Sequence, residues 1–270
     1  MVLALALAAY SLSITGASSG LTAGGGLLLL AAAAGFAAFV AIERRRAMPL
    51  VQLALLSERP ISASLLMNLL IASVMMSTLV VGPLYLAFAL GLDDALVGIV
   101  MAVGPATAAL SGFPAGRLTD RFGARRMLLA GLVQTIAGLL CFALLPGYGG
   151  VIGYVLALML LTPGFQLFLA ANNTSLMIAA PEAQRGMVAG LLGLSRNLGF
   201  MTGAAAMGAL FSLRAGSADI AQASPAAVGA AFSVTFVVAA GLGVLAMLVA
   251  IIGYRTSASG EEHAAPRHAP

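Results

Sequence analysis

The sequence predicts an all-α membrane protein with about eight transmembrane helices. Of its 270 residues, 61% are hydrophobic and only 8% are charged, whereas about a quarter of the residues of a soluble domain are charged. Apolar runs of about 20 residues, long enough to cross a ~30 Å hydrocarbon core, recur along the chain. The short loops between these runs hold nearly all of the charges. We therefore expect a multi-pass helical membrane protein.

The predicted helices follow one another with short connections. They span approximately Val2–Thr15, Ala23–Ile42, Ile61–Leu90, Ala95–Ala115, Met127–Leu145, Val151–Ala179, Met187–Leu213 and Ala226–Tyr254. The first has about 15 residues, or roughly 22 Å of helix. Because no basic segment precedes it, we expect a helix that is cut short rather than a signal peptide.

The basic residues indicate which loops face the cytoplasm. All 13 are Arg, and Arg is concentrated in cytoplasmic loops because its transfer across the membrane is opposed. With a cytoplasmic amino terminus, only Arg214 lies outside and Arg196 falls within a helix. The others then lie in the cytoplasm: Arg44, Arg45, Arg46, Arg59, Arg117, Arg121, Arg125, Arg126, Arg185, Arg255 and Arg267. We expect both termini on the cytoplasmic side of the cell membrane.

The sequence lacks the residue patterns that indicate several other function classes. The net charge of +4 follows from membrane topology, so it does not indicate a nucleic-acid partner. The one cysteine, Cys141, lies in an apolar run and forms no metal-ligand spacing. We find no His cluster, embedded carboxylate pair or nucleotide-binding glycine loop. We therefore expect no enzyme activity, catalytic residue, metal or cofactor.

A charged segment divides the chain into two groups of helices. Residues 43–60 are too short and too charged to span a membrane, and a helix lying at the cytoplasmic interface fits them better. We accordingly divide the chain into a helix pair (1–42), an interfacial linker (43–60), a six-helix unit (61–255) and a disordered cytoplasmic tail (256–270).

The segment from Gly116 to Arg126 carries five charges between two apolar runs. Gly116 and Gly123 have no Cβ, so they permit close backbone approach and unusual dihedral angles. The carboxylate of Asp120 can accept from N–H groups at the amino terminus of an adjacent helix, and the arginines can pair with Asp120, Glu182 or lipid phosphate. Spacing alone leaves a conformational latch and a positive-inside anchor equally open.

This segment resembles the signature loop of the major facilitator superfamily, G-x-L-x-D-R-x-G-R-R. The matching residues are Gly116, Leu118, Asp120, Arg121, Gly123, Arg125 and Arg126, with Ala124 shifting the basic pair by one place. Further segments, among them Pro83-Leu-Tyr85-Leu and Ser195-Arg-Asn-Leu-Gly199, are similar to the fourteen-helix drug:proton antiporter branch. The resemblance covers the whole chain.

The resemblance implies that this chain corresponds to one part of a longer transporter. Residues 1–42 correspond to the helix pair that this branch inserts between its halves, and residues 61–255 to the carboxy-terminal half. The amino-terminal six helices, which hold the proton-coupling carboxylate in this family, are absent. Every acidic residue falls in a predicted loop or tail: Glu43, Glu58, Asp93, Asp94, Asp120, Glu182, Asp219, Glu261 and Glu262.

The resemblance further implies that the signature loop is a latch stabilising the state closed to the cytoplasm. We expect efflux of drugs or other small lipophilic molecules by proton-coupled antiport. The partner is the missing half, encoded upstream or in a separate chain, or a second copy of this chain. The alternative is a truncated or non-transporting membrane scaffold that needs or modulates another transporter.

Polar side chains within the predicted helices are candidates for a transport cavity or for contacts between halves. Thr162, Gln166 and Asn173 fall within about 40° of one another on one helix face, and Asn172 is a neighbour. Lining of a cavity and interhelical hydrogen bonding both explain them. Arg196, roughly 14 Å into its helix, needs a partner, water or access to the headgroups. Weaker candidates are Asn68 and Gln134.

Overall fold

The structure is a computed structural model. It describes residues 57–216 and 220–263, together with residues 34, 35, 37, 38 and 41. Most of the predicted pair of helices within residues 1–42 and most of the predicted linker lie outside the described residues. The helices are α4 (Arg59–Phe88), α5 (Asp94–Phe122), α6 (Ala124–Ala179), α7 (Arg185–Ala215) and α8 (Pro225–His263), with short 3-10 turns at Glu182–Gln184 and Ile220–Gln222. All five helices are long and apolar enough to cross a membrane.

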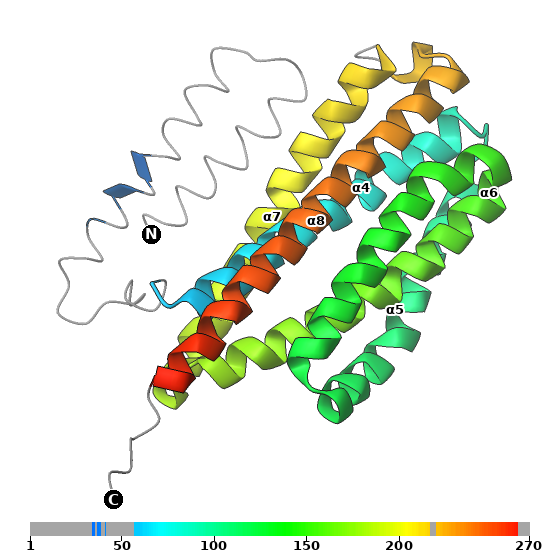
Figure 1. Cartoon of the computed structure of the whole chain (residues 1–270). Helices are drawn as coiled ribbons and strands as arrows, with labels where there is room; N and C mark the ends of the chain where they lie inside the picture. Colours follow the sequence, from blue (N-terminus) through cyan, green and yellow to red (C-terminus); the bar gives the residue numbers. More distant parts are fainter. Residues whose placement is uncertain (1–33, 36, 39–40, 42–56, 217–219, 264–270) are drawn as a thin grey trace, which may run out of the picture.

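Helix α6 is a hairpin of two membrane-crossing arms. The sequence predicts two helices here, Met127–Leu145 and Val151–Ala179, and the 56-residue α6 joins them through Gly150 (φ 52°, ψ −130°). These dihedral angles are open to glycine because it has no Cβ. A Cβ on Gly131, Gly138 or Gly164 would crowd the opposite arm at Phe168, Leu161 or Thr135, respectively. These glycines let the arms pack closely (Figure 1), so the five helices provide six arms.

The segment predicted as a charged loop is almost entirely helical. Helix α5 continues to Phe122 rather than ending at Ala115, and α6 begins at Ala124 instead of Met127. Only Gly123, with φ 88°, breaks the helix between them. A helix is free to extend beyond the hydrocarbon core because its exposed charges are hydrated there, and Arg and Leu are good helix formers. The sequence motif therefore forms two helix ends joined by one glycine.

Helix α4 is central, whereas α5 lies at the edge of the bundle. In α4, 61% of the residues in its most apolar stretch are buried inside the bundle. In α5, the corresponding share is only 6%. Helix α4 packs mainly against α7 and α8, and α5 packs mainly against α6. The large apolar side chains that α5 leaves exposed are Leu96, Ile99, Leu110, Phe113, Leu118 and Phe122. This face is available to lipid or to another protein.

The interface between α4 and α7 depends on two glycines one helical turn apart. A Cβ on Gly199 would overlap the Leu69 carbonyl oxygen, and a Cβ on Gly203 would overlap that of Ser73. The two backbones approach too closely here for any side chain, which is the close packing typical of a G-x-x-x-G step in membrane helices.

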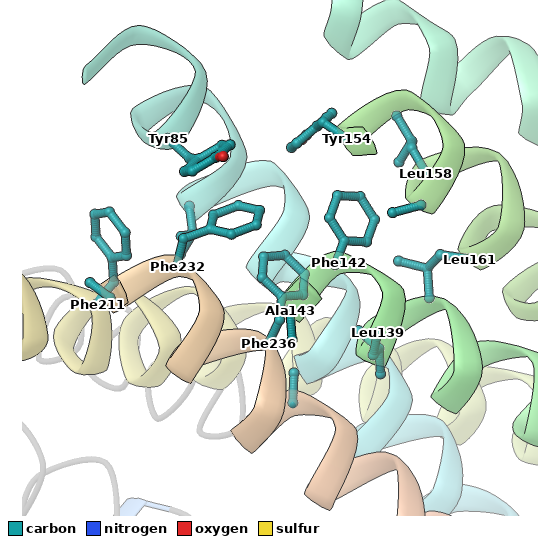
Figure 2. Packing of buried hydrophobic residues seen from close by; sticks show 14 of the residues in the cluster. Tyr85, Leu139, Phe142, Ala143, Tyr154, Leu158, Leu161, Phe211, Phe232 and Phe236 are labelled. Carbon is teal, nitrogen blue, oxygen red and sulfur yellow. The ribbon is translucent and has the colours of Figure 1, made fainter. Parts of the chain in front are cut away.

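Aromatic side chains pack against one another in the core (Figure 2). They come from the parts of the helices that lie away from Gly123. Tyr85 of α4 stacks on Phe232 of α8 with ring centroids 4.1 Å apart. Phe142 of α6 stacks on Phe236 at 4.7 Å and meets Tyr154 edge-on at 5.0 Å. Such ring pairs add to the stabilisation by burial alone, so this cluster joins α4, both arms of α6 and α8.

All the described charges except that of Arg196 lie near the two ends of the bundle. Because neighbouring arms alternate in direction, one end holds Arg59, the helix ends around Gly123, and Arg185, whereas Arg214 lies at the other end (Figure 1). Helix α8 continues to His263, so residues 256–263 are helical where the sequence predicts a disordered tail. The asymmetry of the arginines agrees with the predicted topology, and the side that faces the cytoplasm stays a prediction.

Candidate functional site

A cavity of about 230 Å³ lies between α4, α5, the second arm of α6 and α7. Its lining is mainly apolar and includes two flexible thioethers, Met75 and Met101, which adapt to irregular shapes. Polar groups come from Thr78, Thr162 and Gln166. The other lining residues are Leu79, Gly104, Pro105, Ala108, Leu158, Phe165 and Phe200. The structure thus brings Thr162 and Gln166, two of the predicted site residues, into one cavity.

The polar groups of this cavity differ in whether they are already bonded. The Thr78 hydroxyl donates to the Met75 carbonyl at 2.8 Å, and the Gln166 amide nitrogen donates to the Ala108 carbonyl at 3.1 Å. Within the described residues, neither the Gln166 amide oxygen nor the Thr162 hydroxyl makes a hydrogen bond. The cavity therefore offers two polar oxygens that can accept hydrogen bonds from a bound molecule.

Asn172 and Asn68 form hydrogen bonds between helices and do not line this cavity. The side chain of Asn172 is fully buried; it accepts from the Ser64 hydroxyl at 2.6 Å and donates to the Ser64 carbonyl at 3.3 Å. Asn68, 2% exposed, donates to the Leu192 carbonyl and to the Ser195 hydroxyl, both at 3.0 Å. These contacts tie α4 to α6 and α7.

Asn173 lies in a separate pocket of about 400 Å³, near the ends of α6 and α7. It shares this pocket with Thr174, Met177, Ile178 and Arg185. Its side-chain oxygen is buried and has no hydrogen-bond partner within the described part of the chain. The predicted polar face of Thr162, Gln166 and Asn173 is thus divided between two pockets, because α6 passes different neighbours along its length.

The remaining intramembrane candidates lie apart from the cavity. Gln134 donates to the Leu160 carbonyl at 3.2 Å and so connects the two arms of α6. Arg196 is partly buried on α7, eleven residues or roughly 16 Å from Arg185. Among the described residues, its guanidinium group has no hydrogen-bond or ion-pair partner. A charge at this depth requires water or a partner elsewhere.

The signature segment is exposed at the end of the bundle. Asp120, Arg121, Arg125 and Arg126 are all solvent-accessible. The Arg121 guanidinium lies 5.3 Å from the centroid of the Phe122 ring. The hydrogen bond predicted for Asp120 is not formed with α6, whose amino terminus at Gly123 has no side-chain cap. Gly116 is partly buried on α5, where a Cβ would meet no atom within 4 Å.

Sequence reasoning missed the apolar wall of the cavity. Met75, Met101, Phe165 and Phe200 come from four helices, and nothing in the sequence separates them from other apolar residues that pack or face lipid. Gly104 and Pro105 of α5 also lie in this wall. The nearest sequence signal is the pair Thr162 and Gln166, one turn apart on the same helix.

A bundle of antiparallel apolar arms that encloses a small, weakly polar cavity defines a multi-pass helical membrane protein of the transporter type. Residues 63–269 match the family model of the Major Facilitator Superfamily. The chain therefore belongs to the Major Facilitator Superfamily, as the resemblance of residues 116–126 predicts. It is not an enzyme.

Proteins similar in sequence to this chain include transporters and drug efflux pumps. The chain is 32% identical to the uncharacterized transporter YebQ of Escherichia coli over 46% of its own length and 27% of that protein. It is 24% identical to the multidrug efflux pump LfrA of Mycolicibacterium smegmatis, covering 73% of this chain and 39% of LfrA. It is 28% identical to the drug efflux pump JefA of Mycobacterium tuberculosis, covering 67% of this chain and 35% of JefA. The chain thus spans well under half the length of these relatives.

A solved structure supports the same fold. A crystal structure of the peptide transporter POT aligns with 71% of this chain and 37% of its own, with a TM-score of 0.56 and 20% sequence identity. At this identity the likeness concerns the arrangement of the helices alone.

Proposed function

We propose that the chain forms the carboxy-terminal half of a transporter that exports drugs or other small lipophilic molecules in exchange for protons. Membership of the superfamily supports membrane transport, and two of the distant relatives are named as drug efflux pumps. The observation that carries the substrate class is the cavity, whose wall is apolar apart from a few oxygens and one amide. Such a lining favours apolar molecules with few hydrogen-bonding groups.

The proposed transporter needs a second six-helix unit. Substrate sites of secondary transporters lie near the bilayer midplane between two structural repeats, and the described helices provide one repeat. Helix α5 contributes to the cavity wall and leaves most of its apolar surface uncovered. A second repeat that covers this surface would complete the site. The partner is an amino-terminal half or a second copy of this chain.

Proton coupling is assigned to the partner unit. Every carboxylate whose side chain the structure describes is exposed and lies at a helix end or in a connection: Glu58, Asp93, Asp94, Asp120 and Glu182. Proton relays in membrane transporters use acidic or His side chains within the membrane. The described helices offer none at that depth, so the exchange of protons is expected to depend on the other six helices.

Ethidium binding tests the cavity, because this lipophilic dye carries amino groups that can donate to the oxygens of Thr162 and Gln166. The full chain, purified in mild detergent, should raise the fluorescence of ethidium as the dye leaves water. Gln166→Leu should weaken binding about five- to tenfold, the effect of losing one hydrogen bond of about 1–1.4 kcal/mol.

Gln134→Leu is the matched control, since it removes the same side chain from the same helix outside the cavity. It should leave ethidium binding unchanged. Equal affinities for Gln166→Leu and the unmodified chain would remove the cavity as the site, and a complete lack of saturable binding would favour the non-transporting scaffold.

A further inference from the structure

A groove of about 460 Å³ lies on the outer surface between the first turns of α4 and residues 249–253 of α8. It is separate from the cavity, with which it shares no lining residue. Its lining residues are Arg59, Ser62, Ala63 and Leu66 of α4 with Val249, Ile252 and Gly253 of α8. The helices meet closely at its floor, where a Cβ on Gly253 would lie 2.9 Å from the Ala63 side chain.

The groove changes from polar to apolar along its length. Arg59 is the first residue of α4, and Leu66 lies seven residues or roughly 10 Å deeper in the bundle. Leu66 is 45% exposed and Ile252 is 64% exposed, although both are large apolar side chains. The groove therefore presents a cation at the membrane surface and an apolar channel beneath it, which is the pattern that complements an anionic amphiphile.

Among the described residues, no side chain pairs with the cation at the mouth of the groove. Within the described part of the chain, the Arg59 guanidinium has no hydrogen bond or ion pair, and the neighbouring acid, Glu58, does not line the groove. Helix α4 has no acidic residue in its first turn and no side-chain cap. The positive end of the helix dipole thus adds to the charge of Arg59.

We propose that this groove binds an anionic phospholipid from the adjoining leaflet. The phosphate group pairs with Arg59 at the amino terminus of α4, and an acyl chain lies along Leu66, Val249 and Ile252. Basic pockets between transmembrane helices are suited to such headgroups because charge and burial of the acyl chain act together. This lipid site does not depend on the transport function proposed above.

Lipid retention measures occupancy of the groove directly. The full chain is reconstituted in nanodiscs with equal amounts of phosphatidylglycerol and phosphatidylcholine and transferred to mild detergent. The lipids that remain bound are counted by native mass spectrometry. The unmodified chain should retain phosphatidylglycerol preferentially. Arg59→Gln should reduce that preference at least fivefold, and Arg59→Lys should largely preserve it.

Ile252→Trp tests the apolar part of the groove, because the larger side chain should fill it and reduce the retention of both lipids. Its control is Ile99→Trp on α5, where the original side chain is 66% exposed and does not line the groove. Arg126→Gln is the control for charge, because it removes an exposed cation from the same end of the bundle. Both controls should retain lipid as the unmodified chain does.

Three results would overturn the proposal. Unchanged retention in both Arg59→Gln and Ile252→Trp would mean that lipid does not occupy the groove. An equal loss in Arg126→Gln would show general attraction to the charged end. An equal loss in Ile99→Trp would show that lipid binds over the whole apolar surface.

Discussion

Single polar side chains in this protein have different roles according to what faces them. Asn172 meets Ser64 across a helix interface and makes two hydrogen bonds there. Thr162 lies on the same arm of α6, yet it lines a cavity and has no hydrogen bond among the described residues. Because burying an unpaired polar group is costly, the paired residue suits a structural role and the unpaired one suits contact with a ligand or water.

Replacing Asn172 should therefore destabilise the bundle. Asn172→Ala removes both hydrogen bonds to Ser64 and leaves the buried hydroxyl without its acceptor. We expect a loss of about 0.6–1.7 kcal/mol in the free energy of unfolding, the range of interhelical hydrogen bonds in membrane proteins. Unfolding in mixtures of sodium dodecyl sulfate and mild detergent, followed by circular dichroism, measures this loss.

Asn197→Ala provides the comparison, since it removes the same side chain from an exposed position on α7. Its unfolding curve should match that of the unmodified chain. If the two variants unfold alike, the Asn172–Ser64 pair makes no special contribution to stability.

At the scale of helices, glycine decides which elements approach closely. The arms of α6 meet at Gly131, Gly138 and Gly164, and α7 meets α4 at Gly199 and Gly203. Helix association in a membrane depends on packing and hydrogen bonds, since lipid tails are as apolar as the helix surfaces. Small residues at these positions therefore select the neighbours of α6 and α7.

The interface of α4 and α7 should not tolerate even one added methyl group at its closest point. The Cβ introduced by Gly203→Ala would overlap the Ser73 backbone, which cannot rotate away. We expect a destabilisation of about 1–3 kcal/mol, as for overpacked cores, measured in the same unfolding assay.

Gly190→Ala adds the same methyl group to α7 at a site with no atom within 4 Å of the new Cβ. Because Ala favours helix over Gly by about 1 kcal/mol, this variant should be as stable as the unmodified chain or more so. A similar loss for both alanine variants would contradict the close-packing argument.

At the scale of the whole molecule, the bundle has an uncovered edge and a charged end. Helix α5 forms both, since its apolar face is exposed and its last turns carry Arg117, Asp120 and Arg121. The latch inferred from the family resemblance would operate here, between Asp120 and a group on the proposed second six-helix unit. Within the described residues, Asp120 has no hydrogen bond or ion pair that would compete with such a contact.

Asp120→Asn tests the latch in a complete transporter that contains this chain and its partner half. The substitution removes the charge while keeping the shape, so the state closed to the cytoplasm should lose stability. We expect ethidium efflux from cells to fall severalfold, with the amount of protein in the membrane unchanged on immunoblots.

Asp94→Asn is the matched control, because Asp94 is an exposed acid in the first turn of the same helix, at the opposite end. It should leave efflux intact. Normal efflux in Asp120→Asn would show that the segment anchors the topology without switching.

The sequence by itself determined the membrane class, the six apolar runs after residue 60, the asymmetry of the arginines and the superfamily. These follow from composition, length and local motifs, because the bilayer imposes the same constraint on every crossing segment. The close approach at Gly199 and Gly203 likewise has a local counterpart in the sequence, two glycines one turn apart.

Only the tertiary structure decided which polar residues share a cavity and where the charged segment is helical. Helical periodicity places Thr162, Gln166 and Asn173 on one face, but their neighbours come from helices distant in the sequence. The partner of Asn172 is 108 residues away, and no local pattern encodes that distance. Periodicity fixes the direction of a side chain on its own helix, whereas packing fixes what it meets.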